Sequence, residues 1–78
     1  MRSIYTKEYS AFVEVLIAAR RSRGLTQAAL AERLNKPQSF VSKCESGERR
    51  MDIVEFFAVC KVLEKDPAVL LKEMGFLE

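Results

Sequence analysis

The sequence predicts an all-α fold, a compact bundle of five helices in a single domain over residues 1–78. Apolar residues recur at spacings of three and four, which is the periodicity of a helix that buries one face. Helix-capping residues and glycines stand at the breaks between these segments, and no segment alternates as a strand would. With 78 residues, of which 49% are hydrophobic, the chain can build one small core.

The first predicted helix runs from about residue 6 to residue 22, with Thr6 as its N-cap and Gly24 just beyond its end. Its apolar face carries a cation, Arg20, which needs a buried partner. The residues that define this face are Tyr9, Phe12, Val13, Leu16, Ile17 and Arg20.

Two shorter helices follow, over residues 27–34 and about 38–45. Thr26 is the N-cap expected for the first of them, and Pro37 suits the start of the second. Leu30 and Leu34 face inward from the first. The second has one clear inward pair, Val41 and Cys44, and its other positions, apart from Phe40, are polar and exposed. A helix that buries so little is available for binding.

The fourth and fifth helices each begin with an aspartate. Asp52 with Glu55 three residues later is a capping-box pattern, and Asp66-Pro67 is an N-cap followed by a first-turn proline. Gly75 ends the fifth helix. The apolar face expected for the fourth helix is Ile53, Phe56, Phe57, Cys60 and Leu63, and that for the fifth is Leu70, Leu71 and Met74.

The composition disfavours an enzyme. The chain has no His, which removes the usual general base and most zinc sites, so no metal and no cofactor are expected. Cys44 and Cys60 lie sixteen residues apart and are interpreted as buried thiols. No apolar run is long enough to span a membrane, and no signal peptide precedes the domain, so a cytoplasmic protein is expected.

The formal net charge of +2 hides an uneven distribution. Residues 20–50 contain eight Lys and Arg against three Glu, a net of +5, and residues 51–78 contain three Lys against six Asp and Glu, a net of −3. This asymmetry favours a surface that binds a polyanion, although an ordinary solvated surface gives similar counts.

The basic segment also carries a recognisable motif. Its residues are Gly24-Leu25-Thr26-Gln27, Leu30-Ala31, Leu34, Gln38-Ser39, Val41-Ser42-Lys43, and Glu45 with Gly47. With this spacing the chain resembles the phage-repressor (Cro/repressor, or XRE) type of helix-turn-helix protein over roughly residues 9–74. The resemblance implies a lambda-repressor-like fold, a motif over residues 26–45 and a recognition helix at about 38–45. Asn35 departs from the usual turn glycine, and Glu64-Lys65 from the common Gly-Val.

The resemblance also implies which side chains meet DNA. The outward arc of the recognition helix would enter the major groove and contact bases, through Gln38, Ser39, Ser42 and Lys43. Gln27 would hold a phosphate at a helix N-terminus and steady the first residue of the recognition helix. Basic side chains in the flanking loops would contact phosphates, namely Arg23, Lys36, Arg49 and Arg50. Arg20 would form a structural ion pair with Glu45.

Both ends of the chain are more apolar than a monomer requires. Ile4, Tyr5 and Tyr9 at one end, and Leu70, Leu71, Met74, Phe76 and Leu77 at the other, are interpreted as a dimer interface, with local core capping as the alternative.

The function predicted is a double-stranded DNA-binding transcriptional repressor that reads palindromic sites as a homodimer. The alternatives are an antitoxin-like protein with a protein partner, and an interaction module of the same fold without DNA binding.

Overall fold

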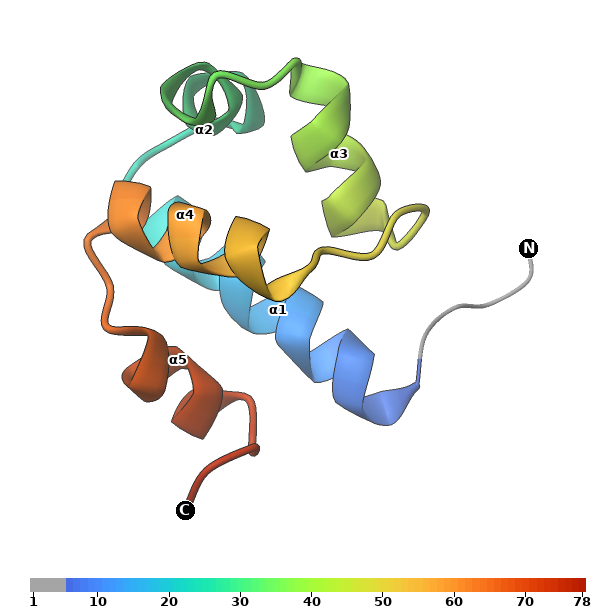
Figure 1. The fold of residues 1–78 in the computed structure, drawn as a ribbon, viewed down its shortest axis with the longest axis vertical. Coiled ribbons are helices and arrows are strands. Elements are labelled where there is room, and N and C mark those ends of the chain that lie inside the picture. The colour runs from blue at the N-terminus through green and yellow to red at the C-terminus, as the bar shows by residue number, and fades with distance from the viewer. Residues whose placement is uncertain (1–5) are drawn as a thin grey trace.

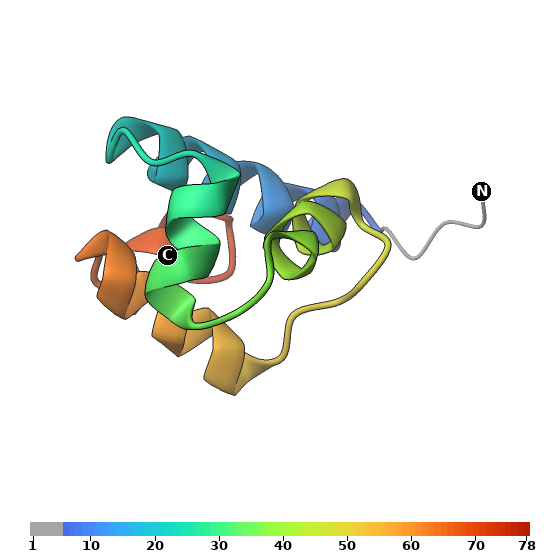
Figure 2. The same ribbon diagram turned by 90° about the horizontal axis from the view of Figure 1, so that it is seen from above.

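The computed structural model describes residues 6–78, which form five α-helices and no strand (Figure 1). The helices are α1 (Lys7–Ser22), α2 (Gln27–Leu34), α3 (Gln38–Ser46), α4 (Ile53–Leu63) and α5 (Pro67–Glu73). Viewed from above, α1 and α4 lie on opposite sides of the molecule (Figure 2). The predicted all-α class and the order of the five helices are confirmed.

Side chains cap four of the five helix starts, as the sequence indicates. The hydroxyls of Thr6 and Thr26 accept hydrogen bonds from the backbone N–H groups three residues on, each at 3.0 Å. Asp52 and Glu55 form a complete capping box, and Asp66 caps α5. Pro37 occupies the N-cap of α3 and supplies no side-chain hydrogen bond, so this helix starts without that stabilisation.

Two helices end on a left-handed residue that is not glycine. Asn35 after α2 has φ 58°, and Glu64 after α4 has φ 56°. Asparagine adopts this conformation at little cost, whereas glutamate pays a steric penalty for its Cβ. In the turn between α4 and α5, Glu64 therefore adopts a left-handed conformation that a glycine would adopt more easily.

The core draws side chains from all five helices, including Leu16, Leu30, Val41, Phe56 and Leu70. Phe56 is 1% exposed, and its ring centroid lies 5.5 Å from that of Phe12 on α1. The largest side chains that are almost completely enclosed come from α4 and α5, namely Phe56, Cys60, Leu63 and Leu70.

The apolar face predicted for α4 is wrong at two positions. Ile53 is 61% exposed and Phe57 is 50% exposed. The stripe that packs on the core is Phe56, Val59, Cys60 and Leu63. One helix can turn only one such stripe toward the core, and Phe57 lies beside it, while Ile53 extends past the end of the core.

The predicted dimer interface is corrected in the same way. Leu70 is 1% exposed and Met74 is 5% exposed, so both belong to the core of the single chain. Leu71 packs partly against that core, and Tyr9 is also buried. Phe76 and Leu77 remain about half exposed, and Ile4 and Tyr5 lie outside the described residues.

Candidate nucleic-acid interface

Helix α3 has one buried face and one polar face. Phe40, Val41 and Cys44 are buried, while α2 and α3 pack side by side at one end of the molecule (Figure 1). The side chains predicted to contact bases share the opposite arc. Gln38, Ser39 and Lys43 are exposed there, and Ser42 is half-buried. The Ser42 hydroxyl donates to the Ser39 carbonyl at 3.3 Å, so it is partly directed along the helix backbone.

A buried ion pair fixes α3 to α1. Arg20 Nε donates to Glu45 Oε2 at 2.7 Å and Nη2 donates to Glu45 Oε1 at 3.0 Å, with the two side chains 8% and 12% exposed. Arg20 Nη1 also donates to the Leu25 carbonyl at 2.8 Å, just before α2. A bidentate pair of this kind holds both helices in one relative position. The cation on the apolar face of α1 is thereby satisfied.

Gln27 joins this ion pair rather than the start of the recognition helix. Its Nε2 donates to Glu45 Oε1 at 2.9 Å, near the C-terminal end of α3. The expectation that Gln27 steadies Gln38 is therefore corrected. This contact connects the first turn of α2 to the end of α3. Side chains from α1, α2 and α3 therefore meet at the Glu45 carboxylate.

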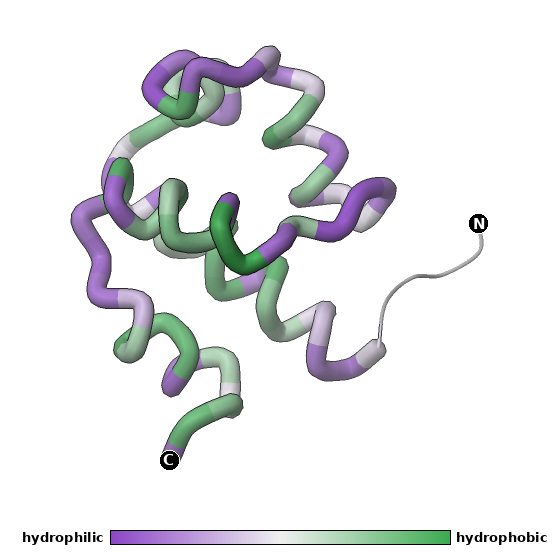
Figure 3. The backbone as a smooth tube through the Cα atoms, viewed as in Figure 1, coloured by the Kyte–Doolittle hydropathy of each residue, from purple (hydrophilic) through white to green (hydrophobic). Residues whose placement is uncertain are grey.

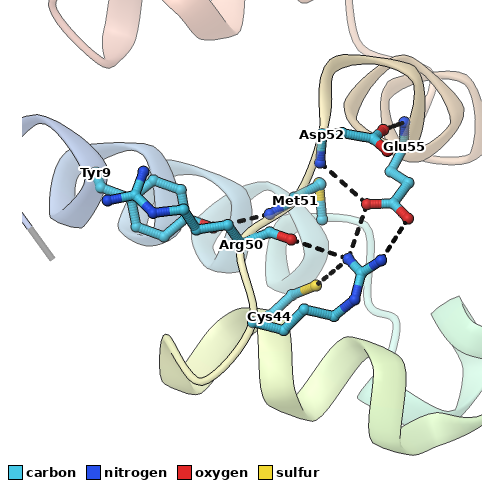
Figure 4. A network of polar contacts seen from close by, with 7 residues as sticks. Tyr9, Cys44, Arg50, Met51, Asp52 and Glu55 are labelled. Carbon is cyan, nitrogen blue, oxygen red and sulfur yellow. Dashed lines mark hydrogen bonds and ion pairs between the residues drawn. The ribbon is translucent and has the colours of Figure 1, made fainter. Parts of the chain in front are cut away.

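A second network organises the loop between α3 and α4 (Figure 4). Arg49 donates from Nη1 to Glu55 Oε1 at 2.8 Å and from Nη2 to Glu55 Oε2 at 2.9 Å. Its Nη1 also donates to the Arg50 carbonyl at 2.9 Å. Glu55 in turn accepts from the Asp52 N–H at 3.0 Å. Arg49 therefore holds the loop onto α4, and because its side chain remains exposed, the phosphate contact predicted for it stays a prediction.

This network predicts a contribution to stability that depends on pH. The hydrogen bond from Arg49 lowers the pKa of Glu55 below its usual 4.5. Because the folded-state pKa is depressed, the stabilisation is present above the unfolded pKa and is lost as the pH falls through the folded value. The pair is partly exposed, so the effect is modest. Thermal unfolding of Glu55→Gln should show a lower Tm than the parent at pH 7. The gap should narrow as the pH falls below 4.5 and vanish once the Glu55 carboxyl is protonated in the folded protein too. A gap that does not change with acidification would contradict this role.

Two aromatic rings hold three of the basic side chains near α3. Lys36 Nζ lies 5.0 Å from the centroid of the Phe40 ring, and Arg49 Cζ lies 4.9 Å from the same centroid. Arg50 Cζ lies 4.5 Å from the Tyr9 centroid. Contacts of this kind restrict a flexible cation without neutralising it. Lys36 and Arg50 are therefore positioned, exposed positive charges at the two ends of the recognition helix.

Arg23 is not part of this group. Its Nη2 lies 3.3 Å from Glu64 Oε2, at the end of α4. The structure thus pairs Arg23 with an acidic residue of the turn between α4 and α5. It does not bring Arg23 beside Arg49 and Arg50. Both side chains are exposed, so the pair adds little to stability.

The two thiols are free and buried. Burial raises the pKa of Cys44 and raises that of Cys60 to about 11, so both remain protonated at neutral pH and are poor nucleophiles. An apolar space of about 20 Å³, lined in part by Leu30, Val41 and Cys44, lies beneath α3. It is about the size of one water molecule.

Other kinds of site are not indicated in the described part of the chain. Across residues 6–78, no three metal-ligating side chains are grouped closely enough to hold an ion. The same residues include no helix with both the length and the apolar content needed to cross a membrane.

Three residues that organise this surface were not identified from the sequence as parts of the site. The sequence indicates Glu55 only as part of a helix cap, Phe40 only as an apolar position, and Tyr9 as an apolar position assigned to a dimer interface. The six-residue separation of Arg49 and Glu55 crosses a loop and fits no helical spacing, so no sequence pattern signals it. The Tyr9 hydroxyl accepts from the Met51 N–H at 3.1 Å, a contact between residues 42 apart in the chain.

Comparison with known proteins is consistent with this architecture. Residues 16–70 match the helix-turn-helix family model. No curated protein sequence matches the chain. An XRE-family like protein from Pseudomonas syringae pv. tomato is 46% identical, with a TM-score of 0.82 over 87% of this chain and 83% of that one.

Two further solved structures share the fold at lower identity. A mutant of the restriction–modification controller protein C.Esp1396I is 25% identical, with a TM-score of 0.83 over 88% of this chain and 92% of that one. The clp gene regulator ClgR from Corynebacterium glutamicum is also 25% identical, with a TM-score of 0.79 over 87% of this chain and 72% of that one. The chain belongs to the XRE family of helix-turn-helix proteins.

Proposed function

We propose that this protein is a sequence-specific double-stranded DNA-binding transcriptional regulator, and that it represses from palindromic sites as a homodimer. Binding, not catalysis, is its proposed activity. The observation that carries the proposal is the polar, exposed arc of α3 on a helix fixed rigidly by the Arg20–Glu45 pair. Family membership and the likeness to proteins described as a controller and a gene regulator support it.

In this proposal the bases are read by four side chains of α3. Gln38, at the first position of the helix, can form a bidentate pair with N6 and N7 of adenine. Lys43 can donate to O6 or N7 of guanine, or to a phosphate. Ser39 and Ser42 supply short donors and acceptors beside them.

The phosphates are contacted by groups that flank this arc. Lys36 and Arg50 are exposed and steadied by Phe40 and Tyr9, and Gln27 lies at the N-terminus of α2, where backbone N–H groups and the helix dipole favour an anion. Arg23 and Arg49 are the other candidates for phosphate contact, exposed beside their acidic partners Glu64 and Glu55.

Gln38→Ala tests the base-reading role. On a duplex enriched from random DNA, the variant should lose about 1–3 kcal/mol of discrimination at one base-pair position per half-site and keep the others. Fluorescence anisotropy against duplexes altered one pair at a time measures this.

Arg50→Ala is the matched phosphate variant, and it should weaken binding to every duplex alike and reduce the salt dependence. If Gln38→Ala keeps the same ranking of duplexes as the parent, α3 does not read bases in the way proposed.

A further inference from the structure

The guanidinium of Arg49 is held from several directions, although the side chain is 44% exposed. Nη1 and Nη2 donate to the two oxygens of the Glu55 carboxylate at 2.8 and 2.9 Å, and Nη1 also donates to the Arg50 carbonyl. The Phe40 ring centroid lies 4.9 Å from Cζ, and Cys44 Sγ lies 3.9 Å from Nη1 (Figure 4). These contacts confine an exposed cation to one orientation.

One edge of this guanidinium is left without a partner. A guanidinium has one hydrogen on Nε and two on each terminal nitrogen. Glu55 and the Arg50 carbonyl take both hydrogens of Nη1 and one of Nη2. No acceptor within residues 6–78 takes the Nε hydrogen or the second Nη2 hydrogen, which together form the open edge of Arg49.

Arg20 shows what such an edge can bind. Its own Nε and Nη2 donate to the two oxygens of the Glu45 carboxylate, at 2.7 and 3.0 Å. The same two nitrogens of Arg49 have the same fixed geometry, because the guanidinium is planar and rigid. The open edge of Arg49 is therefore suited to a second anion, bound by two parallel hydrogen bonds.

Glu55 fixes the guanidinium without covering the open edge. It bonds to the tip of the group, through Nη1 and Nη2, and its side chain is only 15% exposed. The carboxylate is itself held by the capping box, in which Oε1 accepts from the Asp52 N–H at 3.0 Å. The first turn of α4 therefore determines where the Arg49 guanidinium lies.

The surroundings of the open edge favour a phosphate. Arg49 belongs to the loop that follows the recognition helix, and Figure 3 shows this loop as hydrophilic, with the strongly hydrophobic start of α4 after it. Lys36 Nζ lies 5.0 Å from the centroid of the same Phe40 ring. Two cations therefore share this ring, and the single Glu55 carboxylate leaves the group with a net positive charge.

Arg23 lacks such an arrangement. Its ion pair with Glu64 is a single contact of 3.3 Å, and the Glu64 side chain is 70% exposed. In the described part of the chain no aromatic ring restrains it either. An exposed pair of this kind fixes neither side chain, so the two arginine–glutamate pairs are not equivalent.

We propose that Glu55 is a positioning residue for DNA binding, and that it holds Arg49 so that the open edge takes a backbone phosphate beside the recognition helix. Glu55 itself does not touch the DNA. The inference rests on the proposed function and specifies one of its phosphate contacts. Charge alone leads to the opposite expectation, because removing a carboxylate near DNA reduces repulsion and should strengthen binding. Removing Glu55 should weaken binding, because Arg49 is released.

Glu55→Gln tests this role, with Glu48→Gln as the matched control. Each removes one negative charge near Arg49 in the sequence, and Glu48 is exposed and makes no ion pair within residues 6–78. Glutamine can still complete the capping box, but it has one acceptor oxygen in place of two, so the bidentate contact with Arg49 is lost. Circular dichroism should show unchanged helicity for both variants well below their Tm.

Binding is measured by fluorescence anisotropy on a random-sequence duplex at low salt and on the duplex enriched by the parent. On both, Glu55→Gln should bind about three- to tenfold more weakly than the parent. Its affinity should also depend less steeply on salt concentration. Glu48→Gln should bind both duplexes at least as tightly as the parent does.

Variants of Arg49 isolate the pair. Arg49→Ala should weaken binding and reduce the slope of log K against log salt concentration by about 0.9. In that background Glu55→Gln should no longer weaken binding, because no guanidinium is left to position. Arg49→Lys keeps the charge but loses the two-pronged edge, and it should bind more like Arg49→Ala than like the parent.

Unchanged or tighter binding by Glu55→Gln overturns the proposal, because the carboxylate would then only neutralise Arg49. An equal loss with and without Arg49 overturns it too, because the effect would then come from the fold.

The two duplexes separate this contact from the function on which it rests. If no sequence is enriched, but Glu55→Gln weakens binding to the random-sequence duplex only when Arg49 is present, the regulator proposal fails and the positioning role stands. If the parent and Arg49→Ala bind an enriched duplex equally well, the positioning role fails and the regulator proposal stands. A parent that binds neither duplex contradicts both.

Discussion

Replacing Arg20 with alanine is expected to destabilise the protein by about 3–5 kcal/mol, the largest effect of any single polar substitution. The change removes both hydrogen bonds to the Glu45 carboxylate and the one to the Leu25 carbonyl. Glu45 is then left as a buried charge with only the Gln27 amide beside it. In a domain this small, such a loss removes much of the total stability. Chemical denaturation followed by circular dichroism measures it.

Arg21→Ala is the control, because Arg21 is the adjacent arginine and is exposed. It should change the free energy of unfolding little. Replacing Arg20 and Glu45 together with methionine should recover much of the stability, since no charge is then left unpaired. A loss for Arg20→Ala no larger than that for Arg21→Ala would contradict the structural role of the pair.

Leu70→Ala is the second large effect, expected at about 2–5 kcal/mol from lost burial and the cavity left behind. Leu70 is 1% exposed within the single chain, in contact with the core from α5. The loss should be the same at low and high protein concentration, because the side chain stabilises the protomer and not a dimer. Thermal unfolding over a range of protein concentrations measures both points.

Leu77→Ala supplies the comparison. This leucine is 47% exposed, and its truncation should cost far less. If the loss on Leu70→Ala disappeared at protein concentrations high enough for dimerisation, the side chain would belong to an interface after all.

Local signals in the sequence predict the helices well. Threonine and aspartate caps, the Asp52–Glu55 box and the Asp66-Pro67 start each act within one turn, so a short window contains the whole cause. Asn35 likewise signals its left-handed turn. The same short-range logic places the start of α3 directly after Pro37, and the structure confirms this, with Pro37 as the N-cap and Gln38 as the first helical residue.

The sequence does not show what packs against an apolar helix face. The periodicity of α5 shows that Leu70 and Met74 face something, but it does not distinguish the core of the same chain from a second copy. On α4 the apolar residues extend around more of the helix than the core can cover. The sequence pattern therefore assigns Ile53 and Phe57 to the buried face, although the structure leaves both exposed. Only the packed arrangement of the five helices decides between these alternatives.

The roles of the basic side chains in the candidate site likewise cannot be predicted from the sequence alone. The basic segment is evident from counting residues, yet the role of each cation depends on neighbours that are distant in sequence or lie across a loop. Glu64 engages Arg23 and Glu55 engages Arg49, while Phe40 and Tyr9 hold Lys36 and Arg50. Arg23 and Arg49 remain exposed, but a carboxylate partly offsets the positive charge of each, and this increases the importance of base contacts and of a dimer.

The most direct test of the central claim is enrichment of binding sequences from random duplex DNA by the parent protein, followed by titration of the enriched duplex at several salt concentrations. We expect one enriched sequence with two-fold symmetry, whose half-sites lie about one helical turn apart. Its affinity should fall linearly on a plot of log K against log salt concentration. If no sequence is enriched over the starting pool, α3 is not a DNA-reading helix and the regulator proposal is wrong.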